Sequence, residues 1–508
     1  MNSTLEVAIE SPDHVSQDRE TNLRVDSLAH GVLLLIGLTA AQRVVGLVRN
    51  VLFCRLLQPD ELGLFNLAYS VLVIASPLAV LGLPGSFGRY VEYYRQRQQL
   101  RTFVRRAAIL STLLCASFVA VMCWNRTWAT WLAFGDVEQV PLLVSTAVAL
   151  LAVTSFNFLT ELLTALRQVR AVSRMQFVNS VLFALVGLTF LHWSSWRAEG
   201  VVLAYAAACL ASSVVVIGPL RGIWRSLGSQ QEELPHKELW SRIVPFAAWV
   251  WVSNLWTNMF HVSDRYMIVH YSGRSAVEAA ALVGQYHSSR VVPDLFIALA
   301  ALLGSFMLPY LSHDWEQGHR EEVARKIHLT VRLFALAMTL GGVLVLWTAP
   351  LLFEVALGGK YHAGQAVLPW TLMYCVWFGL TVLAQNYLWC AEKASLGSVC
   401  LLVGLLANIG LNLLLLPRLG LLGVVLATAL AHLLTLCLVQ LLSHRLGWRW
   451  SWRTVALALL PASLGLGCYP ATAVVLLTLA ITCSTNWLFT AAEKQAFAAF
   501  VIPYLKFR

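Results

Sequence analysis

Long apolar runs recur along the whole chain and restrict its fold more than any other feature. Each run extends for about 20 residues, enough for a helix to cross roughly 30 Å of hydrocarbon. Hydrophobic residues make up 58% of the 508 residues and charged residues only 12%. A soluble fold cannot bury that much apolar surface with so few charges. Strand patterns are absent, so the sequence predicts an all-α polytopic membrane protein.

We predict about fourteen transmembrane helices. The polar residues 1–27 contain no recognisable cleavable signal peptide, and we expect them to form a disordered tail. Most cysteines lie within apolar runs, and neither cysteines nor histidines show metal-ligand spacing, so we expect no metal site and no cofactor. The predicted spans are 29–55, 63–88, 103–124, 140–164, 175–193, 200–220, 240–270, 281–311, 328–349, 366–390, 395–417, 419–442, 453–468 and 470–489.

The connections between these spans differ strongly in basic charge. Even-numbered loops hold about twenty lysines and arginines, as in GRYVEYYRQRQQLRTFVRR at 88–106, whereas odd-numbered loops hold about six or seven. Lysine and arginine keep short loops on the cytoplasmic side of a membrane. We therefore expect a plasma (bacterial inner) membrane protein with both termini in the cytoplasm. The net charge of +10 follows from this loop bias and does not indicate nucleic-acid binding.

Two segments of the chain recur at nearly one offset. The stretch GVVLAYAAA begins at Gly200 and GVVLATALA begins at Gly423, 223 positions later. ELGLFNLAYS around Gly63 resembles LVGQYHSSR around Gly284, 221 positions later. A common offset suggests a duplicated unit of about 220 residues. Each unit holds six spans, an even number, so both copies enter the membrane from the same side.

The repeat predicts the domain organisation. Two parallel six-helix units related by an axis along the membrane normal are expected to enclose a central cavity. The last two spans are then an addition to the second unit. The predicted segments are a cytoplasmic tail at 1–27, an N-terminal half at 28–222, a linker at 223–239, a C-terminal half at 240–445, and two further helices with a cytoplasmic tail at 446–508.

The apolar stretch RVVGLVRNVLFCRLL carries three permanent charges, Arg43, Arg49 and Arg55. A charge inside a bilayer costs at least ~2.5–3.5 kcal/mol, so such groups face a cavity or a partner. Arg55 lies close to the helix end and can extend to the membrane surface. The repeat offset places Asp264 and Arg265 at the position of Arg43 in the second half. Arg43 and Arg49 therefore either line a cavity or form an internal ion pair with Asp264.

Each of the other polar groups within the spans can be assigned one of two roles. Asp294 either couples transport to an ion or pairs with Arg290 one turn earlier. The amide pairs Asn254/Asn258 and Asn408/Asn412 each present two side chains on one helix face. These amides either form hydrogen bonds between helices or contact a glycan.

Three segments resemble the multidrug/oligosaccharidyl-lipid/polysaccharide (MOP) flippase superfamily, especially its polysaccharide transporter and lipid II flippase branches. RVVGLVRNVLFCRLLQPDELGLFNLAYS resembles the opening of the family. SDRYMIVHY and VGQYHSSRVVPDLFIALAALLGSFMLPYLS resemble its seventh and eighth spans. The segment from Tyr361 to Thr428 resembles spans ten to twelve. The resemblance covers most of residues 28–445.

The resemblance implies a cationic cavity that binds a lipid-linked diphosphate. In lipid II flippases, arginines of the first and eighth spans line the central cavity, and Arg43, Arg49 and Arg290 match those positions. The internal repeat adds Arg265 to this expected set. A further arginine late in the second span of lipid II flippases is missing here, where the chain reads ASPLAVLGLPGSFGRY. This departure favours another lipid-linked glycan as the cargo.

The sequence therefore predicts a non-enzymatic flippase. It would move a polyprenyl-diphosphate-linked oligosaccharide to the outer leaflet for export of a surface polysaccharide such as lipopolysaccharide O-antigen. Membrane lipids and polysaccharide polymerases or glycosyltransferases are its expected partners. One alternative is a cation-coupled drug antiporter of the same superfamily, whose cavity should be acidic. The other is a membrane glycan polymerase or ligase, which generally needs a large outer loop and catalytic carboxylates.

Overall fold

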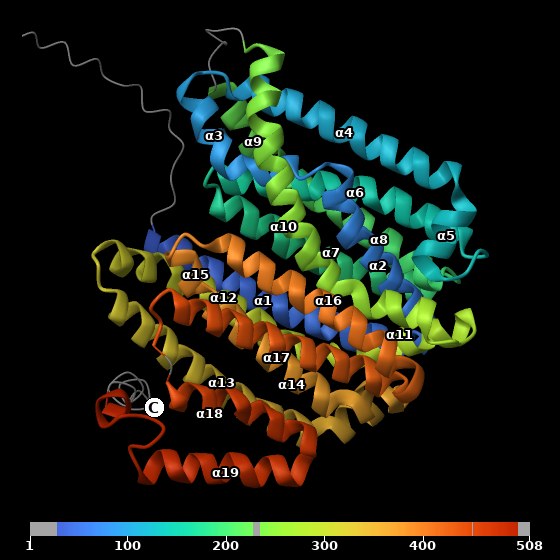
Figure 1. The fold of residues 1–508 in the computed structure, drawn as a ribbon. Helices are drawn as coiled ribbons and strands as arrows, with labels where there is room; N and C mark the ends of the chain where they lie inside the picture. The colour runs from blue at the N-terminus through green and yellow to red at the C-terminus, as the bar shows by residue number, and fades with distance from the viewer. Residues whose placement is uncertain (1–27, 227–233, 450, 496–508) are drawn as a thin grey trace, which may run out of the picture.

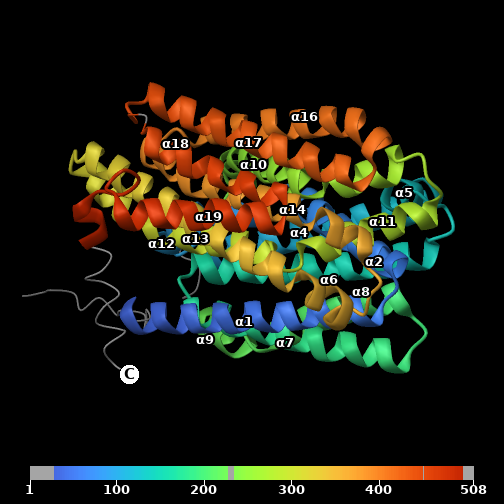
Figure 2. The ribbon, with the colours of Figure 1, turned by 90° about the horizontal axis from the view of Figure 1, so that it is seen from below.

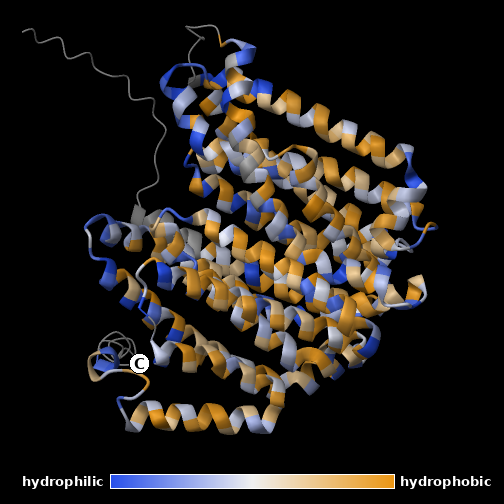
Figure 3. Ribbon diagram, viewed as in Figure 1, coloured by the Kyte–Doolittle hydropathy of each residue, from blue (hydrophilic) through white to orange (hydrophobic). Residues whose placement is uncertain are grey.

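The computed structural model describes residues 28–226, 234–449 and 451–495. The predicted tail at 1–27, part of the predicted linker (227–233) and the last residues (496–508) lie outside these ranges. Every regular element within them is a helix, which confirms the all-α prediction (Figure 1). Figure 3 shows hydrophobic residues along the middle of the helices and hydrophilic residues concentrated toward their ends, as expected for a protein in a bilayer.

The helices follow one another with short connections. In chain order they are α1 (Leu28–Leu56), α2 (Pro59–Ala79), η1 (Leu83–Ser86), α3 (Phe87–Gln96), α4 (Leu100–Trp124), α5 (Arg126–Phe134), α6 (Val140–Ala165), α7 (Val169–Trp193), α8 (Arg197–Val214), α9 (Ile217–Ser226), α10 (His236–Tyr271), α11 (Ala276–Arg290), α12 (Asp294–Glu316), α13 (Arg320–Pro350), η2 (Leu351–Ala356), α14 (His362–Ala384), α15 (Asn386–Cys390), α16 (Ala394–Leu419), α17 (Leu421–Arg445), α18 (Trp452–Leu459), η3 (Leu460–Leu466) and α19 (Cys468–Ser484).

Ten helices in the described ranges are long and apolar enough to cross a membrane by length and composition. They coincide with ten of the fourteen predicted spans. Two further predicted spans, 29–55 and 240–270, correspond to α1 and α10. The last two correspond to shorter apolar stretches, 452–466 and 468–484. The chain is therefore a multi-pass membrane protein.

The helices depart from the predicted spans where the backbone cannot continue. The predicted span 281–311 divides into α11 and α12 at Pro293, which lacks the N–H that a continuous helix would need. The predicted span 63–88 ends at Ala79, and Gly82 then adopts a φ of +68°. A Cβ at Gly82 would lie 2.7 Å from the Trp251 Cβ of α10, so only glycine fits this turn.

The same packing order occurs twice along the chain. In the first half α1 packs against α7, α7 against α8, and α8 against α6. In the second half α10 packs against α16, α16 against α17, and α17 against α14. The two series follow the order of the predicted repeat and run roughly parallel (Figure 2). The helices α18 and α19 pack directly on α13, and η3 between them packs on both α13 and α14.

Two glycines allow a close backbone approach between the halves. A Cβ at Gly63 of α2 would lie 1.8 Å from the Ala280 carbonyl oxygen of α11. A Cβ at Gly284 of α11 would lie 1.9 Å from the Pro59 carbonyl oxygen. The two backbones therefore touch, and this is possible because neither glycine carries a side chain. These are the two glycines that the internal repeat relates to one another.

Helix α10 connects the two halves. Near its start, the Tyr90 hydroxyl donates to the Arg242 carbonyl oxygen at 3.0 Å. The Arg106 guanidinium donates to the carbonyl oxygen of Leu234, just before α10, at 2.6 Å. Further along, α10 packs against α16 of the second half. The helix thus begins against the first half and ends within the second.

Candidate functional site

A cavity of about 370 Å³ lies between the halves, and we call it the arginine cavity. Its walls come from α1, α2, α7 and α8 of the first half and from α10, α11 and α12 of the second. Three guanidinium groups line it, those of Arg43, Arg49 and Arg265. Cavities of this size are typical of ligand sites. The structure thus brings together three of the four arginines predicted to bind a diphosphate.

Helix α1 supplies two of these arginines. The Arg49 guanidinium carbon lies 4.2 Å from the centre of the Phe183 ring, a cation–π contact that orients the side chain. Its Nη2 donates to the Asn50 Oδ1 at 3.3 Å, while its buried Nε has no partner. Arg43 lines the cavity and is exposed to it. Arg55 is also exposed but lies outside the cavity lining.

Helix α10 supplies the third arginine. Arg265 is only 8% exposed, and its Nη1 donates to the Ser70 Oγ of α2 at 2.6 Å. Its Nε has no hydrogen-bond partner. A buried donor without a partner costs free energy, and an anion in the cavity would satisfy it. Within the described ranges, no carboxylate lies at ion-pair distance from Arg43, Arg49 or Arg265.

The carboxylate that lines the arginine cavity is already paired. Asp294, at the start of α12, accepts hydrogen bonds at its Oδ1 from the Arg290 Nε at 3.2 Å and Nη2 at 3.0 Å. Arg290 is buried beside the cavity rather than among its lining residues. Because the Arg290–Asp294 pair is neutral as a unit, the other three guanidinium groups leave the cavity with net positive charge.

Asp264 lies in a separate, buried polar cluster. Its Oδ1 accepts from the Nδ2 atoms of Asn408 and Asn412, each at 3.0 Å. Its Oδ2 accepts from the hydroxyls of Tyr286 and Thr428, each at 2.7 Å. In the part of the chain that the structure describes, no arginine or lysine pairs with Asp264. The four donors instead satisfy the carboxylate.

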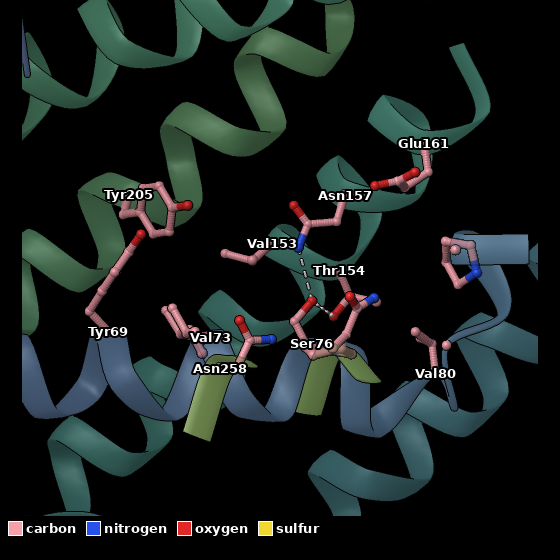
Figure 4. A pocket seen from close by; sticks show the side chains of 16 residues that line it. Tyr69, Val73, Ser76, Val80, Val153, Thr154, Asn157, Glu161, Tyr205 and Asn258 are labelled. Carbon is pink, nitrogen blue, oxygen red and sulfur yellow. Dashed lines mark hydrogen bonds between the residues drawn. The ribbon is translucent and has the colours of Figure 1, made fainter. Parts of the chain in front are cut away.

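A second cavity of about 370 Å³ adjoins the arginine cavity, and we call it the amide cavity (Figure 4). Asn254 and Asn258 of α10 line it together with Asn157 of α6. The Asn157 Nδ2 donates to the Ser76 Oγ at 3.0 Å. Glu161 lies at the end of the cavity opposite Tyr69 and Tyr205. The lining is therefore rich in hydrogen-bonding groups and carries a single carboxylate.

A pair of tyrosines separates the two cavities. Tyr69 of α2 and Tyr205 of α8 line both cavities, with ring centres 5.9 Å apart. Figure 4 shows the two side chains converging at one end of the amide cavity. A ligand that filled both cavities would pass between or displace these rings.

The family of polysaccharide biosynthesis proteins matches residues 28–315, more than half of the chain. The chain belongs to this family. No curated protein matches the sequence closely enough to count as a relative.

The fold is similar to solved structures of MOP superfamily members. Lipid II flippase MurJ in an inward closed conformation has a TM-score of 0.69 at 12% identity, over 92% of this chain and 100% of that chain. An inward-facing multidrug-resistance MATE family transporter has a TM-score of 0.57 at 14% identity, over 80% and 95%. A MOP superfamily transporter from Pyrococcus furiosus has a TM-score of 0.55 at 12% identity, over 82% and 95%. This member of the polysaccharide biosynthesis family thus has a MOP transporter fold.

Several cavity residues were not predicted from the sequence. Tyr69, Tyr205 and Asn157 lie in predicted spans but were not selected as site residues. A lone amide such as Asn157 in an apolar span is a signal for a cavity or a helix contact. Tyrosines give no such signal, because they are common in both packing and membrane-surface positions.

Proposed function

We propose that this protein is a flippase that translocates a polyprenyl-diphosphate-linked oligosaccharide from the cytoplasmic to the outer leaflet. The observation that carries the proposal is the arginine cavity, which three arginines line without carboxylate partners in the described ranges. Such a cavity attracts an anion and repels a cation. A diphosphate is a compact anion that hydrocarbon cannot accommodate, so it needs a cavity of this kind to cross the membrane.

Guanidinium groups suit this cargo for two reasons. They bind phosphate oxygens through paired N–H groups, and they stay charged at any physiological pH. Charge attraction is also stronger in a cavity surrounded by apolar helices than in water. Arg43 and Arg49 would approach the diphosphate from α1 and Arg265 from α10. The cargo would thus be held by both halves at once.

The amide cavity is the proposed place for the sugars. Sugar hydroxyls both donate and accept hydrogen bonds, as amides do. Asn157, Asn254 and Asn258 could serve neutral sugars while the diphosphate stays with the arginines. The prenyl chain would remain in the bilayer between the halves. Rocking of one half against the other would then present the head group to the outer face.

We further propose that Asp264 couples the movement to a proton or a monovalent cation. Its carboxylate is buried among neutral donors, and the nearby Asn412 Oδ1 has no hydrogen-bond partner. Oxygen ligands from Asp264, Asn412 and Thr428 could hold such a cation. Asp294 is less suited to this role because Arg290 already neutralises it.

The membrane orientation remains part of the proposal. We propose that the basic loops and both termini lie in the cytoplasm. The protein would then lie in the bacterial inner membrane. Polysaccharide polymerases and glycosyltransferases are the proposed partners, and lipopolysaccharide O-antigen is one export product of this type. A drug antiporter is disfavoured because a cavity with net positive charge repels cationic drugs. A polymerase or ligase is disfavoured by the short connections between the helices.

A sidedness assay in proteoliposomes tests the proposed function. A fluorescent polyprenyl-diphosphate oligosaccharide is added, and the fraction that an outer-leaflet reagent can reach is followed with time. The double variant Arg49→Gln/Arg265→Gln should translocate at least about tenfold more slowly, because each lost charged hydrogen bond weakens diphosphate binding. The variant Arg55→Gln changes the same residue type on α1 outside the cavity and should behave as wild type.

Two results would contradict the proposal. One is normal translocation by the double variant. The other is equal protection of the wild-type protein against thermal unfolding by farnesyl diphosphate and by farnesol, because the cavity should distinguish a diphosphate from an alcohol on the same chain.

A further inference from the structure

A second basic pocket, of about 460 Å³, lies at the end of the bundle that carries the basic loops. It shares no lining residue with the arginine cavity. Its walls are the start of α13, the connection from α17 to α18, and α15. Four arginines line it, and Glu321 is the carboxylate among its lining residues. The four are Arg320, Arg325, Arg332 and Arg449.

Two of the four arginines already have carboxylate partners. Arg325 pairs with Glu322 at 2.6 Å. Arg332 pairs with Glu493 at 2.5 Å and donates to the Leu488 carbonyl oxygen at 2.8 Å. The buried Arg332–Glu493 pair fixes one wall of the pocket, and in both pairs the carboxylate already occupies the guanidinium group.

The other two arginines are available. Arg320 lies over the ring of Trp315 at 5.1 Å, and in the described ranges it has no ion-pair partner. Arg449 approaches Glu321 only to 3.8 Å, with both side chains about 90% exposed. Such an exposed, distant pair contributes little stability. The pocket therefore presents two guanidinium groups from two different parts of the chain.

The position of Arg449 is fixed by a neighbouring network. His328 of α13 bonds through Nε2 to the Arg449 carbonyl oxygen at 3.0 Å and through Nδ1 to the Thr454 Oγ1 at 2.9 Å. The rings of Tyr387 and Trp448 stack beside it with centres 5.2 Å apart. The backbone that carries Arg449 is thus held against α13, and the pocket is a built feature rather than a loose loop.

Aromatic residues place the pocket at the level of lipid head groups. Trp452, which begins α18, contacts Trp487 with ring centres 4.8 Å apart, and the two side chains are 50% and 62% exposed. Exposed tryptophans gather at the boundary between hydrocarbon and water. Basic pockets between helices at this level are suited to anionic lipid head groups.

We propose that this pocket binds the phosphodiester head group of an anionic phospholipid, with Arg320 and Arg449 as its ligands. One phosphate held by both would bridge the start of α13 and the α17–α18 connection. The lipid would thereby fasten the appended helices α18 and α19 to the second half. This site is independent of the proposed cargo, which binds in the arginine cavity.

Lipid titration of the purified full-length protein in a neutral detergent tests the proposal. Phosphatidylglycerol, phosphatidylcholine and inorganic phosphate are the three probes, with bound lipid counted by native mass spectrometry and the melting temperature measured in parallel. The wild-type protein should retain phosphatidylglycerol and gain thermal stability from it, and the other two probes should give neither effect. The affinity of the variant Arg320→Gln/Arg449→Gln for phosphatidylglycerol should be lower than that of the wild type by a factor of at least about ten.

A matched control separates this pocket from general surface charge. The variant Arg105→Gln/Arg174→Gln removes two exposed arginines from the basic end of the first half and should keep wild-type lipid binding. Equal binding of phosphatidylglycerol by Arg320→Gln/Arg449→Gln and the control would overturn the proposal. An equal effect of phosphatidylcholine would overturn the requirement for an anionic lipid. A full effect of inorganic phosphate alone would assign the pocket to a soluble anion instead.

A further variant controls for misfolding of the glutamine variant. Arg320→Lys/Arg449→Lys keeps both charges but loses the paired N–H geometry. It should bind phosphatidylglycerol with an affinity between those of the wild type and the glutamine variant. Affinity no better than that of the glutamine variant, in a protein with a wild-type melting temperature without lipid, would contradict a charge-based site.

Discussion

Asp264 and Arg265 are neighbours in the sequence, yet α10 directs them to different surroundings. A helix turns by about 100° per residue, so adjacent side chains point in different directions. The Asp264 carboxylate meets Asn408, Asn412 and the two hydroxyls of its cluster. The Arg265 guanidinium reaches Ser70 and the arginine cavity. One dipeptide thus places the proposed ion site and the proposed anion site on one rigid element.

The variant Asp264→Asn tests this link at the scale of one residue. An amide has a single acceptor oxygen, so its NH₂ group would face donors that the carboxylate now satisfies. Translocation should fall at least about tenfold, because an unsatisfied buried pair costs ~1–3 kcal/mol and the coupling charge is lost. Binding of farnesyl diphosphate should stay close to wild type, because Arg43, Arg49 and Arg265 are retained. The two measurements are the sidedness assay and a thermal-shift titration.

The opposite pattern would contradict this assignment. Unchanged translocation with weakened diphosphate binding would make Asp264 a support for Arg265 and not a coupling group. A rate that in wild type depends on neither sodium nor pH would also exclude coupling through this carboxylate.

At the scale of elements, hydropathy predicts where helices lie better than where they end. Each predicted span falls on a helix because burial of apolar runs in lipid leaves the backbone no other hydrogen-bonded form. The breaks depend on local chemistry, as at Pro293. The short helix α5 was not predicted. Its Asn125 accepts from the Trp128 N–H at 3.4 Å to begin it, and Gly135 with a φ of +69° ends it.

The candidate site was predictable in part for a similar reason. Charges in apolar spans carry a cost that must be compensated, so Arg43, Arg49 and Arg265 were identifiable from the sequence. Which partner compensates them depends on helix rotation and crossing, and no local pattern encodes either. Arg290 therefore lies outside the cavity lining. The tyrosine pair between the cavities is likewise a product of tertiary packing.

The segment after α19 is anchored to α13 through the carboxylate of Glu493. The Glu493 carboxylate accepts from Arg332 of α13, and its Oε2 also accepts from the Thr490 N–H at 2.8 Å. Partial burial alone would raise the pKa of Glu493, but these hydrogen bonds outweigh it and hold the pKa below its ordinary value of 4.5. The ionised form is therefore stabilised in the folded protein.

This depressed pKa predicts a pH-dependent contribution to stability. A carboxyl group whose pKa is lower in the folded state contributes fully above its unfolded value, and the contribution disappears as pH falls through the folded value. At pH 7, Glu493→Gln should therefore lower stability by about 1 kcal/mol, or the apparent melting temperature by a few degrees. The difference should persist down to about pH 5 and shrink as pH falls below 4.5.

Thermal unfolding from pH 3 to pH 8 provides the measurement. Glu316→Gln is the matched control, because Glu316 is exposed at the end of α12 and forms no ion pair within the described ranges. A difference between wild type and Glu493→Gln that stays constant across the whole range would show that the ion pair with Arg332 does not depend on ionisation of the carboxyl group.

At the scale of the whole molecule, two kinds of contact join the halves. Away from the basic end, the backbones of α2 and α11 touch at Gly63 and Gly284. Near the same level, the Lys360 Nζ donates to the Arg55 carbonyl oxygen at 3.1 Å, and the Tyr361 hydroxyl donates to the Cys54 carbonyl oxygen at 2.9 Å. These contacts join the two halves on this side. The proposed alternating access requires that they separate when the proposed cargo leaves.

The glycine contact is the part of this junction that a single methyl group can disrupt. In Gly63→Ala, the Ala280 carbonyl oxygen must move from 1.8 Å to an ordinary distance of at least 3.4 Å from the new Cβ. Helices α2 and α11 must then separate by roughly 1.6 Å, because both atoms belong to rigid backbone. The protein should favour a conformation open at this end, and translocation should slow because the closed state is destabilised. Diphosphate binding should be retained.

Spin labels at Asp60 and Val277, near the starts of α2 and α11, report the separation through double electron–electron resonance. Gly410→Ala is the matched control, since a Cβ there meets open space, and it should leave the distance distribution unchanged. In Gly63→Ala the distribution should move to longer distances even without cargo. Because a Cβ at Gly284 would lie 1.9 Å from the Pro59 carbonyl oxygen, Gly284→Ala should produce the same shift. A wild-type distribution in both variants would mean that α2 and α11 are not the elements that join the halves at this end.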